Sequence, residues 1–180
     1  VFIYIYFSIC YKFSTNAGSG KLKKTVPVVK YHCALELIMP GHGKDRLMIL
    51  KTIQAGVLNV AYYEYGPADG SPIIMCHGFP YDVHAYTASS MTLALNGARV
   101  IVPFLRGYGD TRFLSDETPR SGEQAVLAYD LISLMDALKI QKALLAGYDW
   151  GGRAACIVSA LWPERVTALV TGNSYTIQDI

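Results

Sequence analysis

The sequence predicts an α/β fold with three layers, in which helices cover both faces of a mostly parallel sheet. From residue 47 onward, short apolar segments alternate with amphipathic ones, which is typical of parallel strands joined by helices. Of the 180 residues, 52% are hydrophobic and 17% are charged, which is a globular composition. This length is enough for one domain of ordinary size.

Two segments rich in β-formers, residues 48–53 and 57–65, follow one another without a helix, which favours an antiparallel start to the sheet. Buried strands are expected at residues 73–76, 99–103, 143–146 and 166–170. Helices are expected at residues 84–95, 121–138 and 150–161. Ser121 is the expected N-cap of the second helix, where Gln124 completes a capping box.

Residues 1–46 form an expected N-terminal extension and linker, poorly ordered, ahead of the α/β domain over residues 47–180. Residues 1–13 are almost all apolar or aromatic, but the run is shorter than the roughly 20 residues of a membrane helix. No basic segment or cleavage site frames it as an export signal. We therefore expect a cytoplasmic protein, with membrane contact or export through residues 1–13 as the alternative.

The charge pattern and the metal-binding residue types exclude several classes of partner. The net charge of +2 indicates no nucleic-acid partner. The four cysteines form no C-x-x-C pair and are interpreted as reduced thiols. The four histidines lack the spacing of metal ligands on a helix, so we expect no metal and no cofactor.

The sequence Gly-Tyr-Asp-Trp-Gly-Gly at residues 147–152 lies between an expected strand and an expected helix. In this context a glycine-flanked residue forms a nucleophile elbow, a sharp turn that exposes one side chain at a helix N-terminus. A Cβ at Gly147 or Gly151 would clash across the turn. The exposed residue here is Asp149, which we predict to be the catalytic nucleophile.

An aspartate at this position changes the chemistry that the elbow performs. A carboxylate needs no base to activate it, and the helix dipole favours its charged form. It attacks saturated electrophilic carbon, as in an epoxide or an alkyl halide, and the product is an ester on Asp149. Water must then attack the carboxyl carbon of Asp149, and the oxyanion that forms needs backbone donors.

The amides of Trp150 and Phe79 are the expected oxyanion-hole donors. Trp150 follows the nucleophile directly, and Phe79 lies in the loop after the third expected strand, where such folds place the second donor. Pro80 cannot donate, and the bond that precedes it is a candidate cis peptide.

Three motifs together resemble the epoxide hydrolase and haloalkane dehalogenase branch of the α/β-hydrolase fold family. They are His-Gly-Phe-Pro at residues 77–80, Arg-Gly-Tyr-Gly at 106–109 and Gly-Tyr-Asp-Trp-Gly-Gly-Arg at 147–153. The resemblance implies the same nucleophile and the same two amide donors. It also implies that the family's lid, supporting acid and catalytic histidine follow the sixth strand. We therefore expect a chain ending at Ile180 to lack them, and to be alkylated at Asp149 without turning over.

The leading interpretation is a hydrolase that forms an alkyl ester on Asp149, with epoxide hydrolase preferred. Its partners would be a small apolar electrophile and water. The alternatives are a haloalkane or haloacid dehalogenase and an inactive truncated fragment without a general base. A receptor on the same fold is disfavoured, because it would be expected to carry serine at the elbow.

Four further residues are candidates for lining the pocket: His77, Pro80, His84 and Tyr148. For His77 the resemblance implies a structural role. The residues around His84 also fit a polar helix start. The loop at residues 106–109 is interpreted as a structural turn beside the site, and Arg153 as a residue that packs near the start of the helix.

Overall fold

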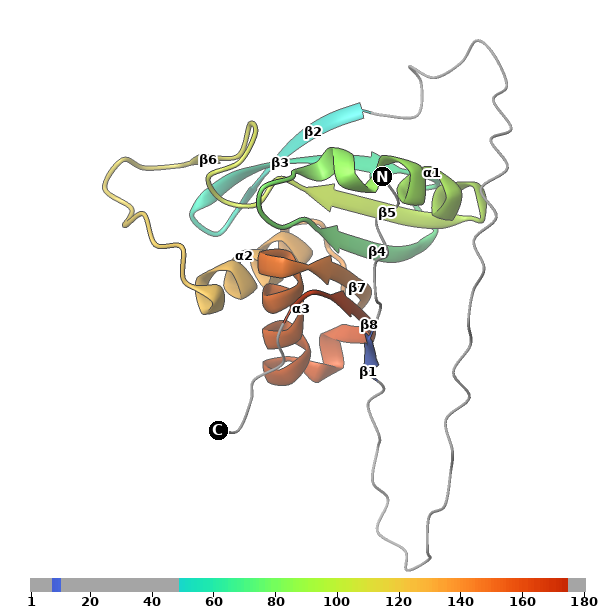
Figure 1. The fold of residues 1–180 in the computed structure, drawn as a ribbon. Helices are drawn as coiled ribbons and strands as arrows, with labels where there is room; N and C mark the ends of the chain where they lie inside the picture. Colours follow the sequence, from blue (N-terminus) through green and yellow to red (C-terminus); the bar gives the residue numbers. More distant parts are fainter. Residues whose placement is uncertain (1–7, 11–48, 175–180) are drawn as a thin grey trace, which may run out of the picture.

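The computed structural model describes residues 8–10 and 49–174, whose strands form one eight-stranded sheet (Figure 1). The strand order is β1-β8-β7-β4-β5-β3-β2, and β6 pairs with β3 beside this path. The strands are β1 (Ser8–Cys10), β2 (Ile49–Ala55), β3 (Leu58–Tyr65), β4 (Ser71–Cys76), β5 (Ala98–Pro103), β6 (Arg112–Phe113), β7 (Ala143–Tyr148) and β8 (Val166–Gly172).

The helices connect the parallel strands. They are α1 (Thr87–Leu95), α2 (Gln124–Ala137) and α3 (Asp149–Leu161), with short 3₁₀ helices η2 (Val83–Tyr86) and η3 (Pro163–Arg165). Strands β5, β4, β7 and β8 are parallel neighbours, whereas β2 pairs antiparallel with β3, and β3 with β5. This arrangement confirms the predicted parallel sheet and its antiparallel start.

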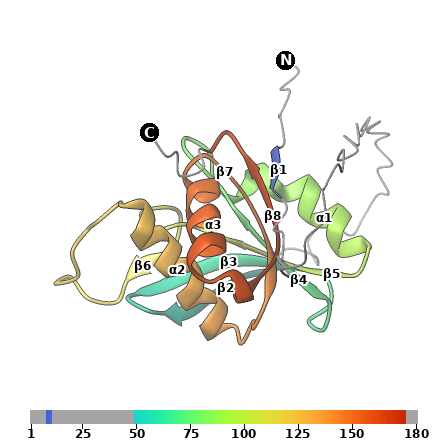
Figure 2. The same ribbon diagram turned by 90° about the horizontal axis from the view of Figure 1, so that it is seen from below.

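The two faces of the sheet are covered unequally. Helices α2 and α3 lie together on one face, and α1 lies on the other (Figures 1 and 2). Alternate side chains of each strand point to opposite faces. Ile74 and Leu145 therefore join the core under α2 and α3, while their neighbours Met75 and Ala146 join the core on the side of α1.

The N-terminal prediction falls mostly outside the described residues. Within residues 1–46, the structure describes only β1, which pairs antiparallel with β8 and places Ile9 opposite Val170. The domain boundary near residue 47 stays a prediction. Among the helices of the described ranges, none has both the length and the apolar character needed to cross a membrane.

The predicted capping box at Ser121 is wrong. Helix α2 begins at Gln124, and its N-cap residue Glu123 makes no side-chain cap. Ser121 lies in the preceding loop, where its Oγ accepts from the Glu123 amide and its carbonyl accepts from Arg106. Ser121 therefore bonds to the distant loop that carries Arg106 and does not cap the helix, as its local sequence had predicted.

Candidate functional site

Asp149 lies at the tip of a sharp turn between β7 and α3. It is the first residue of α3, and its φ of 48° is in the left-handed region. Apart from glycine, mainly asparagine and aspartate adopt this region. The carboxylate therefore sits in the first turn of the helix, where the helix dipole stabilises negative charge.

The glycines around the elbow permit close backbone approach. A Cβ on Gly147 would lie 2.7 Å from the backbone of Gly151, across the turn. A Cβ on Gly151 would lie 2.2 Å from the carbonyl oxygen of Cys76 in β4, and one on Gly78 would lie 2.5 Å from the Cβ of Asp149. The predicted clash across the turn therefore holds for Gly147, whereas a Cβ on Gly151 would clash with the end of β4, against which the start of α3 lies.

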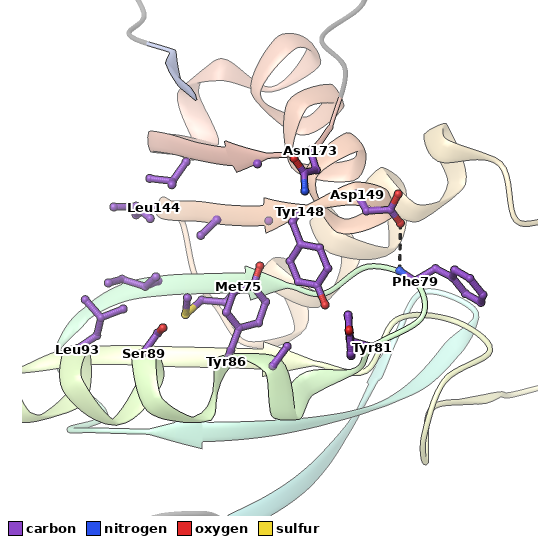
Figure 3. Close-up of a pocket in the computed structure, with 16 residues that line it drawn as sticks. Met75, Phe79, Tyr81, Tyr86, Ser89, Leu93, Leu144, Tyr148, Asp149 and Asn173 are labelled. Atoms are coloured by element: carbon purple, nitrogen blue, oxygen red, sulfur yellow. Dashed lines mark hydrogen bonds between the residues drawn. The ribbon is translucent and has the colours of Figure 1, made fainter. Parts of the chain in front are cut away.

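The Phe79 amide donates a hydrogen bond of 3.0 Å to Oδ1 of Asp149 (Figure 3). The loop that carries this amide follows β4, and its Phe79–Pro80 peptide bond is cis. Phe79 thus meets Asp149 through its backbone, while its side chain is 67% exposed. The structure brings together the predicted nucleophile and one of the two predicted amide donors.

Two side chains hold the loop that carries Phe79. The hydroxyl of Tyr86 donates to the carbonyl of Cys76, the last residue of β4, over 3.1 Å. His77 is fully buried, and its Nε2 accepts from the amide of Leu105. The prediction that His77 lines the pocket is wrong, because its ring turns into the protein and links this loop to the loop after β5.

Burial lowers the pKa of His77, and this makes a prediction about stability. The unfolded chain takes up this proton at a higher pH than the folded chain does. The stability that neutral His77 contributes is therefore present above a pH of about 6.5 and is lost as the pH falls below it. We expect the free energy of unfolding, from denaturant titrations between pH 7.5 and 5, to fall by up to about 1.4 kcal/mol per pH unit.

His77→Gln is the control for this pH dependence. Its amide can accept from Leu105 and does not titrate. The variant should keep a flatter profile than the wild type between pH 7.5 and 5. Equal slopes in the two proteins would show that His77 is not the group responsible.

A cavity of about 760 Å³ opens beside Asp149, between α1 and the exposed part of the sheet face (Figure 3). Of the four predicted lining residues, Tyr148 lines it, next to Asp149. His84 does not, because its Nδ1 pairs with Asp82 at 2.9 Å at the start of η2. Pro80 does not line this cavity either, although its neighbours Phe79 and Tyr81 do.

Tyr148 packs against Tyr86 across the cavity wall, with ring centroids 5.7 Å apart. Its hydroxyl is buried and faces the backbone of Gly78 without a hydrogen bond of normal geometry. Burial raises the pKa of this phenol, and the negative charge of Asp149 adds to the effect. The phenol therefore stays protonated near neutral pH.

Trp150 is the second residue of α3, so its amide is one of those at the helix start that have no partner within the helix. The guanidinium of Arg153 lies over its indole ring, 4.6 Å from the centroid. The indole lines a smaller cavity of about 200 Å³ on the other side of the loop that carries Phe79. Arg153 thus packs at the helix start, as predicted.

The loop at residues 106–109 is anchored to α2 by an ion pair. The Nε and Nη2 of Arg106 each lie 2.6 Å from one carboxylate oxygen of Asp130, and both side chains are largely buried. Such a bidentate pair fixes position as well as charge. This geometry fits the structural role that the sequence indicated for the loop.

Cys76 is a free thiol. Cys76 is buried, which raises the pKa of its thiol to about 12, and Cys156 is partly buried. Within residues 8–10 and 49–174, no group of three or more His, Cys, Asp or Glu side chains is placed to hold a metal ion.

Sequence and structure comparisons place these features in a known family. A family model described as alpha/beta hydrolase fold matches residues 71–179. The chain is 37% identical over 101 residues to epoxide hydrolase 3 of Siraitia grosvenorii, covering 56% of this chain and 31% of that protein. It is 32% identical over 120 residues to a haloalkane dehalogenase of Mycobacterium marinum, covering 66% of this chain and 39% of that protein.

The fold is also similar to a solved structure. A provisionally assigned epoxide hydrolase from Klebsiella pneumoniae superposes with a TM-score of 0.66 and 55% sequence identity, covering 67% of this chain and 40% of that one. The chain thus spans about a third of the length of the curated relatives it matches. The sheet order, the turn at Asp149 and the family match lead to one assignment: this chain belongs to the alpha/beta hydrolase fold family, and among its members it is similar to epoxide hydrolases and haloalkane dehalogenases.

Proposed function

We propose that this chain carries the nucleophile of an epoxide hydrolase-like enzyme, and that Asp149 is that nucleophile. The observation that supports this most is the bond between the Phe79 amide and Oδ1 of Asp149, at the mouth of an apolar cavity. A carboxylate held in this way has one oxygen fixed by a backbone donor while its residue lines the cavity. The relatives named as epoxide hydrolases favour this chemistry over the other reactions of the fold.

The two oxygens of Asp149 have different roles in the proposed reaction. Oδ1 is engaged by Phe79, so Oδ2 attacks the less hindered carbon of the epoxide. The bond from that carbon to the ring oxygen breaks, and the ring oxygen takes up a proton. The product is a hydroxyalkyl ester of Asp149 in which Oδ1 is the carbonyl oxygen.

Hydrolysis of this ester completes the reaction. Water loses a proton to a base and attacks the carboxyl carbon of Asp149, which places negative charge on Oδ1. The amides of Phe79 and Trp150 stabilise that charge. Collapse then breaks the bond between the carboxyl carbon and the ester oxygen, which takes the proton from the base and leaves as part of a vicinal diol. One epoxide and one water are consumed for each diol formed.

The base for the second step is not among the described histidines. His77 is buried and bonded within its loop, and His84 pairs with Asp82. Neither contacts Asp149 within the described part of the chain. We therefore propose that residues 49–174 support formation of the ester and that its hydrolysis needs a base from elsewhere.

Intact-protein mass spectrometry after incubation with styrene oxide tests this proposal. We expect one adduct with the mass of one epoxide per chain, located on Asp149 by peptide mapping. Adduct formation should stop near one equivalent, and no diol should be released. Multiple turnover by the purified 180-residue chain, persisting after His32 and His42 are replaced, would contradict the proposal that residues 49–174 lack the base. An adduct on another residue would contradict the assignment of Asp149.

A haloalkane dehalogenase is the second candidate, because one relative bears that name. A parallel incubation with bromohexane distinguishes the two. Alkylation with release of one bromide, faster than the reaction with a matched epoxide, would favour the dehalogenase. Reaction with the epoxide alone would favour the epoxide hydrolase.

A further inference from the structure

Tyr86 contacts both of the segments that form the site. Its hydroxyl donates a hydrogen bond of 3.1 Å to the carbonyl of Cys76, at the start of the loop that carries Phe79. Its ring packs against that of Tyr148, the residue before Asp149, with centroids 5.7 Å apart. Figure 3 shows the two rings next to each other, one from the end of β7 and one from η2. Tyr86 is therefore placed to act on both partners of the bond between the Phe79 amide and Asp149.

The carbonyl of Cys76 lies where three elements meet. Cys76 is the last residue of β4 and pairs with Gly147 of β7. Its carbonyl oxygen also faces the start of α3, since a Cβ on Gly151 would lie 2.2 Å from it. From this peptide the chain leaves the sheet and reaches Phe79 three residues later. Peptide groups are planar, so a hydrogen bond that fixes the carbonyl also fixes the direction in which the loop begins.

Tyr148 adds a second contact with the same loop. Its hydroxyl is buried and faces the backbone of Gly78, the residue before Phe79. The ring of Tyr86 lies against the ring of Tyr148 and limits the rotamers that it can adopt. Tyr86 thus acts on the loop directly at Cys76 and, through Tyr148, at Gly78.

We infer that Tyr86 is a positioning residue that keeps the Phe79 amide directed at Oδ1 of Asp149, where it donates over 3.0 Å. This inference rests on the proposed function, in which the amide stabilises negative charge on Oδ1. That charge develops when the ester is attacked, and an oxyanion-hole donor is effective only when it is aligned in advance. Attack on the epoxide uses Oδ2 instead. Loss of the Tyr86 hydroxyl should therefore slow cleavage of the ester much more than its formation.

Cleavage of the ester by hydroxylamine tests this difference and needs no base from the protein. Full chains that carry the styrene oxide adduct are treated with hydroxylamine, whose nitrogen attacks the carboxyl carbon of Asp149. An N–H proton passes to the ester oxygen, which leaves as part of the diol, and a hydroxamate that mass spectrometry detects remains on Asp149. Tyr86→Phe keeps the ring and loses only the hydroxyl. We expect its adduct to form within about twofold of the wild-type rate and its hydroxamate to form about ten- to a hundredfold more slowly.

Tyr65→Phe is the matched control. Tyr65 is also buried, and its hydroxyl lies beside the side chain of Thr87, the first residue of α1. The variant therefore removes a tyrosine hydroxyl near the same helix start but leaves the bond from Tyr86 to Cys76, and we expect both of its rates to match the wild type. Equal slowing of hydroxamate formation in Tyr65→Phe, or an unchanged rate in Tyr86→Phe, would overturn the positioning role.

Amide hydrogen exchange in the unmodified full chain separates this inference from the proposed function, because it involves no epoxide. In Tyr86→Phe the Phe79 amide should exchange at least about tenfold faster, since its hydrogen bond opens more often. The Leu105 amide, which bonds the same loop through His77, should exchange as in the wild type. Faster exchange at Phe79 in a chain that styrene oxide does not alkylate at Asp149 would support the positioning role and contradict the proposed function. Unchanged exchange at Phe79, or an equal rise at Leu105, would overturn the positioning role.

Discussion

Replacing Asp149 by asparagine should slow formation of the epoxide adduct by at least about a thousandfold and leave the fold intact. The amide of asparagine is a far weaker nucleophile than a carboxylate. Asparagine tolerates the left-handed backbone that this position requires, where φ is 48°. Its side-chain oxygen can still accept from the Phe79 amide, which Oδ1 of Asp149 does at 3.0 Å. Pseudo-first-order rates of adduct formation, followed by mass spectrometry, measure the effect.

Asp149→Ala provides the matched comparison. Alanine also removes the nucleophile, but it is strained by about 1–2 kcal/mol at a positive φ and leaves the Phe79 amide without its acceptor. We expect both variants to lose the adduct and only the alanine variant to show a clearly lower melting temperature. An asparagine variant that formed the adduct at the wild-type rate would show that another residue is the nucleophile.

The sequence was sufficient to predict the sharp turn at Asp149 because the signals for that turn are local. A buried strand, a glycine on each side of the tip and a helix all lie within about 20 residues. The same holds for Phe79, since its loop directly follows a buried strand. Each of these predictions depended on backbone geometry near the residue concerned, and the structure places both residues accordingly.

The cavity could not be predicted in the same way. A short apolar strand such as residues 143–146 reads as buried on both faces, yet Leu144 lines an open groove because no helix covers that part of the face in the described chain. Whether a face is covered depends on the path of distant helices. The sequence did contain one signal of the cavity, since Ser89 and Leu93 in α1 recur at helical spacing with Tyr86, which directly precedes the helix.

Two other features could not be predicted from the sequence, one because the strand is too short and the other because it depends on a contact that is remote in the sequence. Strand β6 has two residues, Arg112 and Phe113, which is too short for any periodic pattern. His77 belongs to the predicted motif, but its direction is set by the Leu105 amide, which comes from a loop 28 positions away. Contacts of this kind appear only when the chain is folded.

Gly151→Ala should destabilise the protein by at least about 3 kcal/mol, because the added methyl group has no space. Its Cβ would lie 2.2 Å from the Cys76 carbonyl oxygen and 2.3 Å from that of His77. Both obstacles are backbone atoms at the end of β4, so no side-chain rotation relieves the overlap. In an exposed helix the same change would stabilise the protein by up to about 1 kcal/mol. A loss of stability in Gly151→Ala would therefore show that the close contact with β4 outweighs the helix propensity of alanine.

Gly122→Ala is the control for the Gly151 variant, because no atom lies within 4 Å of its added Cβ and its φ is not positive. We expect this change to be neutral or to stabilise by up to about 1 kcal/mol, through the unfolded chain. Urea denaturation of both variants measures the difference.

The Gly151→Ala change should also affect the site, because moving α3 away from β4 moves Asp149 away from the Phe79 amide. Adduct formation should therefore fall even in the fraction of the Gly151→Ala protein that remains folded, whereas equal rates in that fraction would show that the close approach serves stability alone.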